Sequence, residues 1–280
     1  MRKLFGRSIS AAALILAVFL AGSFHGNTAP QLQKESLVYL YQGAAQGGQT
    51  ETSVAAQITV NQPVVKSTDY HSLVELSIAS TDGKQIVEVG WIVDRTGING
   101  TDLTNPHLFV GAWVNNNFLG YNNAAGSGWV DNTAVATNAG ASLASYVGAA
   151  TPPIFGMVHY NSAWWVSFDG NYIGDFPDTL WTGATPSVTT FTVFNVFQGF
   201  GEVAANLTSP TTTTCTDMGS GVLPTAYGTP TTAAKIASVT YSATTAVLSP
   251  MSVAVPANYT NYVSGTSRSV TLGGPGTGTC

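Results

Sequence analysis

The sequence has 280 residues, of which 44% are hydrophobic and only 8% are charged. This length is enough for one large domain, and the apolar content excludes intrinsic disorder. Nine basic residues against fourteen acidic ones leave no basic surface for a phosphate backbone, which excludes nucleic-acid binding as a main function. Thirty glycines and thirteen prolines suit strands and turns rather than helices, so an all-α fold is excluded as well.

The N-terminus has the pattern of a secretory signal peptide. Arg2, Lys3 and Arg7 form a basic region, and an apolar run at 9–21 follows it. We therefore expect residues 1–29 to be a signal peptide and the protein to be secreted. The alternative is a retained N-terminal anchor. Cleavage would remove three of the nine basic residues and no acidic one, leaving a net charge of 6 − 14 = −8. After cleavage no membrane partner is expected, because no later stretch is long and apolar enough to span a bilayer.

Residues 30–52 are interpreted as a linker or a small pro-segment, because glutamine and glycine dominate their second half. From residue 53 onward, runs rich in valine, isoleucine and leucine alternate with turn residues. The predicted strands are 54–60, 73–79, 85–93, 107–114, 154–160, 164–168, 189–197, 236–241 and 246–255.

The spacing of these runs is typical of an all-β sandwich or barrel, and no fixed-period repeat divides the chain. The predicted fold is an antiparallel β-sandwich of two packed, curved sheets, forming a single domain over residues 53–280.

The chain has two cysteines, Cys215 and Cys280. An even pair in an exported chain predicts one disulfide, which here ties the last residue to a loop 65 positions earlier. Without a nearby histidine cluster, the two cysteines do not form a metal site. No cofactor is expected.

Common catalytic signatures are missing from the sequence, including a phosphate-binding loop, an HExxH motif and a nucleophile elbow. The four histidines, which could in principle serve a serine hydrolase, are interpreted as polar residues at strand ends rather than catalytic bases. They are His25, His71, His107 and His159.

The glutamates are more informative, because only five occur and two of them lie in unusual surroundings. Glu88 interrupts the otherwise apolar run 86–93, and alternation along a strand leaves apolar residues on both of its faces. Glu202 lies among aromatic, glycine and apolar residues in 197–203. Few cations are available to pair with either carboxylate.

Two glutamates that share a pocket can also share a proton, one neutral and one ionised, as acid–base activation of water requires. The alternative is that Glu88 and Glu202 are two unrelated strand residues, each satisfied by backbone donors or a lysine. Composition alone favours this alternative.

Several segments, in order along residues 55–280, resemble motifs of the neprosin family of secreted glutamic peptidases. These segments are IVEVGWIV at 86–93, LF at 108–109 with Trp113, GYN at 120–122, SGWV at 127–130, WWV at 164–166 with Gly174 and Pro177, GFGEV at 199–203, DMGSG at 217–221, and GGPG at 273–276 followed by Cys280.

The resemblance implies a β-sandwich with a cleft that holds two catalytic glutamates, which correspond here to Glu88 and Glu202. It also implies endopeptidase activity at acidic pH, with a preference for cleavage after proline. In this mechanism one ionised glutamate accepts a proton from the attacking water, and the other, protonated, polarises the carbonyl and donates to the leaving amine. The sequence does not assign the two roles. The expected partner is a peptide or protein substrate, and the oligomeric state is left open.

Trp91, Tyr121, Trp165 and Phe200 are candidates for the cleft walls, although aromatic residues in a sandwich are more often core. Gly199 and Phe200 stand where the family has tryptophan and glycine, so the wall beside Glu202 differs. This departure motivates a rival interpretation, a non-catalytic secreted module that binds polysaccharide or a cell surface. Carboxyl groups within about one water's reach of each other would favour the enzyme.

Overall fold

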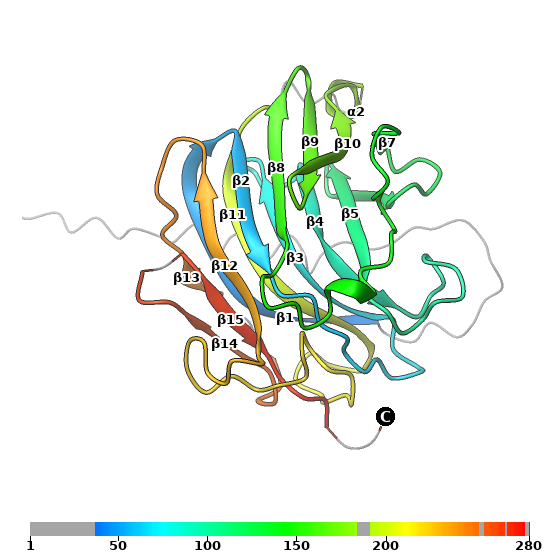
Figure 1. The fold of residues 1–280 in the computed structure, drawn as a ribbon, viewed down its shortest axis with the longest axis vertical. Helices are drawn as coiled ribbons and strands as arrows, with labels where there is room; N and C mark the ends of the chain where they lie inside the picture. Colours follow the sequence, from blue (N-terminus) through cyan, green and yellow to red (C-terminus); the bar gives the residue numbers. More distant parts are fainter. Residues whose placement is uncertain (1–36, 184–190, 252–254, 267, 278–279) are drawn as a thin grey trace, which may run out of the picture.

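A computed structural model describes residues 37–183, 191–251, 255–266, 268–277 and 280. These residues form two large antiparallel sheets that pack face to face (Figure 1). The predicted fold class, a single-domain β-sandwich, is confirmed. The proposed signal peptide lies outside the described residues.

Within the described residues, one sheet has seven strands in the order β13-β1-β11-β3-β4-β5-β6. Its strands are β1 (Leu37–Glu51), β3 (His71–Ala79), β4 (Ile86–Asp94), β5 (His107–Val114), β6 (Asn117–Tyr121), β11 (Phe194–Asn206) and β13 (Ser249–Pro250).

The other sheet, over the same described residues, has eight strands in the order β14-β15-β12-β2-β8-β9-β10-β7. Its strands are β2 (Ser53–Ile58), β7 (Val130–Asp131), β8 (Ile154–Tyr160), β9 (Ala163–Phe168), β10 (Asn171–Pro177), β12 (Ala234–Tyr241), β14 (Thr260–Val263) and β15 (Val270–Gly273). A 3-10 turn (η1, Ala144–Tyr146) and one turn of α-helix (α2, Thr179–Thr182) are the helical elements of the described chain.

The predicted strands at 107–114 and 154–160 match β5 and β8. The strands β3, β9 and β12 differ from the predictions by one or two residues at one end, and β2 and β4 differ at both ends. The strand predicted at 189–197 instead begins at Phe194 and runs on to Asn206, so Glu202 lies within β11. In the run 246–255, the structure assigns only Ser249–Pro250 as strand, and 252–254 fall outside the described residues.

The prediction that 30–52 is a linker is wrong for residues 37–51. These residues form β1, which pairs with β11 along most of its length and with β13 on its other side (Figure 1). Glycine is required at position 43 of this strand, because the backbone of β11 approaches closely. A Cβ on Gly43 would lie 2.3 Å from the carbonyl oxygen of Gly199. The sandwich therefore begins before residue 53.

The main hydrophobic core lies between the two sheets. Alternation along β4 directs Val87, Val89, Trp91 and Val93 into this core. The other face of the seven-stranded sheet carries a separate apolar cluster centred on Leu73, Ile92, Phe109 and Phe200. Because this outer face also carries the buried glutamates, the candidate site is on it.

Candidate active site

Glu88 and Glu202 lie on the same outer face of the seven-stranded sheet. Glu88 extends from β4, and Glu202 extends from β11, on the other side of β3. Both are buried, with exposed fractions of 4% and 8%. Among the described residues, neither forms an ion pair with a lysine or an arginine. The structure therefore places both predicted glutamates on one largely apolar surface.

Glu202 is held by hydrogen-bonding groups on the neighbouring strands. Its Oε1 lies 2.6 Å from Nε2 of His71, at the start of β3. The hydroxyl of Tyr41, opposite it on β1, also hydrogen-bonds to the Glu202 side chain. A hydroxyl group that donates to a carboxylate also orients it for reaction. The pKa of Tyr41 is raised well above its usual value by burial and by the charge of Glu202, so this hydroxyl keeps its proton to donate.

Glu88 has different surroundings. Its Oε2 accepts a hydrogen bond from Nε1 of Trp113 on β5, at 3.0 Å. Gly111, directly opposite on β5, leaves room for the carboxyl group, because a Cβ there would lie 3.1 Å from the same oxygen. Burial raises the pKa of Glu88 to about 8; the Trp113 hydrogen bond opposes this shift, and the charge of Glu202 adds to it. Glu88 therefore stays protonated at acidic and neutral pH.

A third glutamate, Glu75, lies between these two on β3. It pairs with Phe200 on β11 and with Gly90 on β4. Glu202 is two residues beyond Phe200, and Glu88 is two residues before Gly90, so the three carboxyl groups form a diagonal row across adjacent strands. We call Glu202, Glu75 and Glu88 the carboxyl row.

Glu75 is the most enclosed of the three, with an exposed fraction of 2%. Burial, the charge of Glu88 and the charge of Glu202 together raise its pKa well above the usual value. Among the described residues, its Oε2 has no hydrogen-bond partner. Diagonal neighbours on adjacent strands lie about 7–8 Å apart, within reach of long side chains. A single water can therefore bridge adjacent carboxyl groups of the row more readily than it can bridge the two end groups, Glu88 and Glu202.

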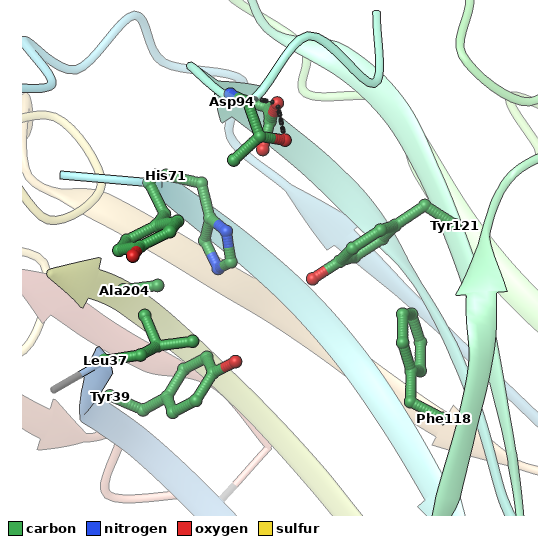
Figure 2. Close-up of a pocket in the computed structure, with 9 residues that line it drawn as sticks. Leu37, Tyr39, His71, Asp94, Phe118, Tyr121 and Ala204 are labelled. Atoms are coloured by element: carbon green, nitrogen blue, oxygen red, sulfur yellow. Dashed lines mark hydrogen bonds between the residues drawn. The ribbon is translucent and has the colours of Figure 1, made fainter. Parts of the chain in front are cut away.

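A cavity of about 190 Å³ opens at the Glu202 end of the carboxyl row. Figure 2 shows the rings of Tyr39, His71 and Tyr121 around it, with the tyrosine hydroxyls directed inward. The residues that line it are Leu37, Tyr39, Tyr70, His71, Asp94, Thr96, Phe118, Tyr121 and Ala204. Neither Glu88 nor Glu202 lines this cavity, and His71 connects it to the Glu202 carboxyl group.

The four aromatic residues proposed for the cleft walls lie in different places. Tyr121 and Phe200 belong to the outer-face cluster beside the carboxyl row. Trp91 is fully buried in the core between the sheets, where its Nε1 donates to the carbonyl of Thr59. Trp165 lies on β9 in the other sheet and packs against Tyr172. The structure therefore brings two of the four to the site.

Of the two departures from the family motif near Glu202, only one faces the site. Phe200 shares its face with Glu202, and its ring meets Tyr41 edge-on. Gly199 points to the opposite face, where a Cβ would lie 3.1 Å from Ile236 of the core. The missing tryptophan at this position therefore changes the core, whereas Phe200 changes the wall of the site.

Sequence reasoning missed Glu75, His71, Tyr41 and Trp113 as parts of the site. The sequence does contain a signal for Glu75, because this glutamate interrupts the apolar run 73–79 as Glu88 interrupts the apolar run 86–93. His71 and Tyr41 had no such signal, since their role depends on which strands pair. The described residues contain no cluster of histidine, cysteine, aspartate and glutamate suited to a metal ion. Nor do they contain a helix long and apolar enough to cross a membrane.

We compared the chain with curated proteins, with solved structures and with models of protein families, and only the family comparison is informative. No curated protein matches the sequence. Among solved structures, scytalido-glutamic peptidase with a transition-state analogue inhibitor aligns with 86% of this chain and 100% of its own, at a TM-score of 0.44 and 8% identity. SCP-B, a member of the eqolisin family of peptidases, aligns over the same shares at a TM-score of 0.34 and 8% identity.

A carbohydrate-binding module, CBM66 from Bacillus subtilis, aligns with 58% of this chain and 74% of its own, at a TM-score of 0.27 and 11% identity. Structural likenesses this weak do not assign an activity. The sequence itself matches the family described as Neprosin over residues 68–275, which is most of the chain and includes the whole carboxyl row. The chain therefore belongs to the neprosin family, and this membership supports a peptidase function.

Proposed function

We propose that the protein is a secreted glutamic endopeptidase whose catalytic residues are Glu88 and Glu202. The observation that carries this proposal is the placement of both buried carboxyl groups on one apolar sheet face, with no lysine or arginine partner for either among the described residues. Buried carboxyl groups with divergent surroundings are the usual basis for splitting acid and base roles.

The surroundings of the two carboxyl groups differ enough to suggest their roles. Glu202, with the His71 and Tyr41 donors, acts as the ionised base that takes a proton from the attacking water. Glu88, whose pKa burial raises to about 8, acts as the acid that polarises the scissile carbonyl and protonates the leaving amine. Activity then falls as the pH rises through about 8, because Glu88 loses the proton that it must donate.

The cavity at the Glu202 end offers a subsite for a substrate side chain. Tyr39, Phe118 and Tyr121 give it aromatic walls, which suit a compact apolar ring such as that of proline. We therefore propose cleavage after proline as the preferred specificity. Secretion through the proposed signal peptide is compatible with the Cys215–Cys280 disulfide, since disulfides persist in oxidising compartments.

The test is cleavage of a proline-containing peptide library by the purified protein between pH 3 and pH 9. Glu88→Gln and Glu202→Gln should each reduce turnover by about 10²-fold or more, the usual contribution of a general acid or base. Glutamine is nearly isosteric, so both variants should stay folded by circular dichroism. Asp175→Asn, which changes a partly buried carboxyl group on the other sheet, is the matched control and should cleave normally.

Near-normal turnover in either glutamine variant would refute the assigned dyad. If the wild-type protein cleaves no peptide at any pH but binds polysaccharide in a pull-down assay, the rival interpretation as a binding module is correct.

A further inference from the structure

Glu75 lies at the centre of the carboxyl row, yet bond cleavage as proposed above does not use it. A buried carboxyl group is costly to keep, and one whose Oε2 finds no partner among the described residues is more so. Glutamine or leucine would fit this apolar face at lower cost. The presence of an ionisable group therefore calls for a reason in the chemistry of the site.

Each turnover leaves the two catalytic glutamates in the wrong protonation states. Glu202 has gained a proton from the attacking water, and Glu88 has given its proton to the leaving amine. Before the next turnover one proton must travel from Glu202 to Glu88. These two side chains are two strands and four residues apart in register, so a direct transfer between them is disfavoured.

We propose that Glu75 is the relay residue that carries this proton, a role that rests on the peptidase function proposed above. It donates its own proton to the Glu88 carboxylate and takes the proton from Glu202. One O–H bond forms and one breaks at Glu75, whose charge is unchanged at the end, and no other reactant is needed. Each of the two transfers spans a single diagonal of the sheet, about 7–8 Å between backbones and within reach of glutamate side chains.

The site face restricts other routes for the proton. The exposed fractions along the carboxyl row are only 2–8%, and Phe109 and Phe200 flank it. Among the described residues, the ionisable groups that interact with Glu75 are Glu202 on β11, Glu88 on β4 and Tyr41 on β1. Tyr39 on β1, Tyr121 on β6 and His71 at the start of β3 interact with Glu202 instead.

The three tyrosines in this set have raised pKa values, chiefly through burial, and stay neutral. His71 is paired with Ala204, beyond Glu202 along β11, and its Nε2 contacts Oε1 of Glu202. Glu75 is therefore the acid placed between donor and acceptor. Its own raised pKa keeps it protonated at rest, as a relay that must first donate requires.

Glu75→Gln tests the relay, because glutamine keeps the size and hydrogen-bonding groups but cannot exchange a proton between two carboxyl groups. With enzyme in excess over a peptide substrate, its single-turnover rate should stay within about threefold of wild type, because bond cleavage is intact. Its steady-state rate should fall by about tenfold or more. Raising the acetate concentration at fixed pH and ionic strength should restore that rate, since a small acid can carry the proton from solution.

Wild type and Ser77→Ala, a change two residues along the same face of β3, should show no dependence on acetate. Glu75→Asp keeps an acid at this position and should be intermediate; it also serves if the glutamine variant does not fold. Glu75→Gln with normal steady-state turnover would overturn the relay. So would equal loss of single-turnover and steady-state rates without acetate rescue, which would place Glu75 in bond cleavage or in folding. A wild-type protein without activity would refute the peptidase function instead.

Discussion

His71 shows how one residue outside every recognised motif can contact a proposed catalytic group. Its Nε2 lies 2.6 Å from Glu202, and its ring lies between those of Tyr39 and Tyr121 at the cavity. A hydrogen bond to a charged group contributes about 1.5–3 kcal/mol, so its loss from the proposed base, Glu202, should be visible in kcat.

We predict that His71→Ala lowers kcat by roughly 10- to 100-fold, because Glu202 loses a donor that stabilises and orients its ionised form. His159→Ala is the control: His159 also pairs with a carboxylate, Asp178, at 3.0 Å, but it lies on β8 in the other sheet. The measurement is steady-state cleavage of one peptide by both variants. Equal effects of the two substitutions would mean that the His71 contact is structural only.

At the scale of strands, the site depends on how closely β3 and β4 approach each other. A Cβ on Gly90 would lie 2.2 Å from the carbonyl oxygen of Val74 and 2.7 Å from Cβ of Glu75. Gly90, two residues after Glu88 on β4, therefore makes room for the paired Glu75 of the carboxyl row.

Gly90→Ala should therefore destabilise the fold by at least about 1–3 kcal/mol, because the added methyl group forces two paired strands apart. Gly265→Ala has nothing within 4 Å of the added atom and should change stability by less than about 0.5 kcal/mol. Urea unfolding of both variants measures the difference. A Gly90→Ala protein as stable as wild type would show that β3 and β4 can separate without loss.

The sequence was sufficient to predict those strands whose hydrophobic pattern is strong, and the two glutamates that break such patterns. The apolar runs of β4 and β5 are unambiguous, because burial on both faces leaves little room for polar residues. β1 was missed, because glycine and glutamine have low strand propensity and its stability comes from pairing with β11.

The composition of the site was less predictable for the same physical reason. Trp113 contacts Glu88, and Tyr41 contacts Glu202, only because β5 and β1 pair in one particular register. A shift of one residue would turn these side chains into the core. Trp91, three residues after Glu88 on the same strand, shows the reverse case, since alternation directs its side chain into the core and away from the site.

For the whole molecule, the Cys215–Cys280 disulfide closes the C-terminal part of the chain; the structure confirms the predicted pair, with Cα atoms 5.4 Å apart. Thr277 donates to the carbonyl of Thr214, and Gly276 donates to the carboxylate of Asp217, so the tail is also hydrogen-bonded to the loop that it joins.

A cross-link over 65 residues stabilises by about 4 kcal/mol in the chain-entropy model. Reduction should therefore lower the melting temperature by about 8–16 °C, at roughly 2–4 °C per kcal/mol for a domain of this size. Differential scanning calorimetry with and without reductant measures the shift. Two free thiols, detected by alkylation of the denatured but unreduced protein, would contradict the pairing itself.

The carboxyl row also determines how the stability of the whole molecule depends on pH. Burial raises the pKa of Glu88 to about 8 and that of Glu75 well above its usual value of 4.5. Between pH 4.5 and pH 8 the folded protein therefore keeps protons that the unfolded chain has lost. The free energy of unfolding must then fall as the pH rises, by up to about 1.4 kcal/mol per pH unit for each such group.

Other carboxyl groups act in the opposite sense, but at lower pH. For Glu51, burial would raise the pKa, but hydrogen bonds from Thr244, Ser242 and the backbone lower it below 4.5. For Asp82, hydrogen bonds from Ser80 and Lys84 likewise outweigh burial and lower the pKa below 3.8. Their contributions are complete above these values and are lost only on stronger acidification, so stability should be greatest near pH 4–5.

We predict that the free energy of unfolding, measured with urea at pH 4.5, 6 and 8, decreases steadily across this series. Glu88→Gln should make the decrease shallower, because glutamine holds no proton to lose, whatever its effect on stability at a single pH. Asp82→Asn should leave the slope between pH 4.5 and pH 8 unchanged, since Asp82 titrates below that range. A free energy of unfolding that stays constant or rises from pH 4.5 to pH 8 would show that the carboxyl row is not protonated in the folded protein, and would remove the acid that both catalysis and the relay require.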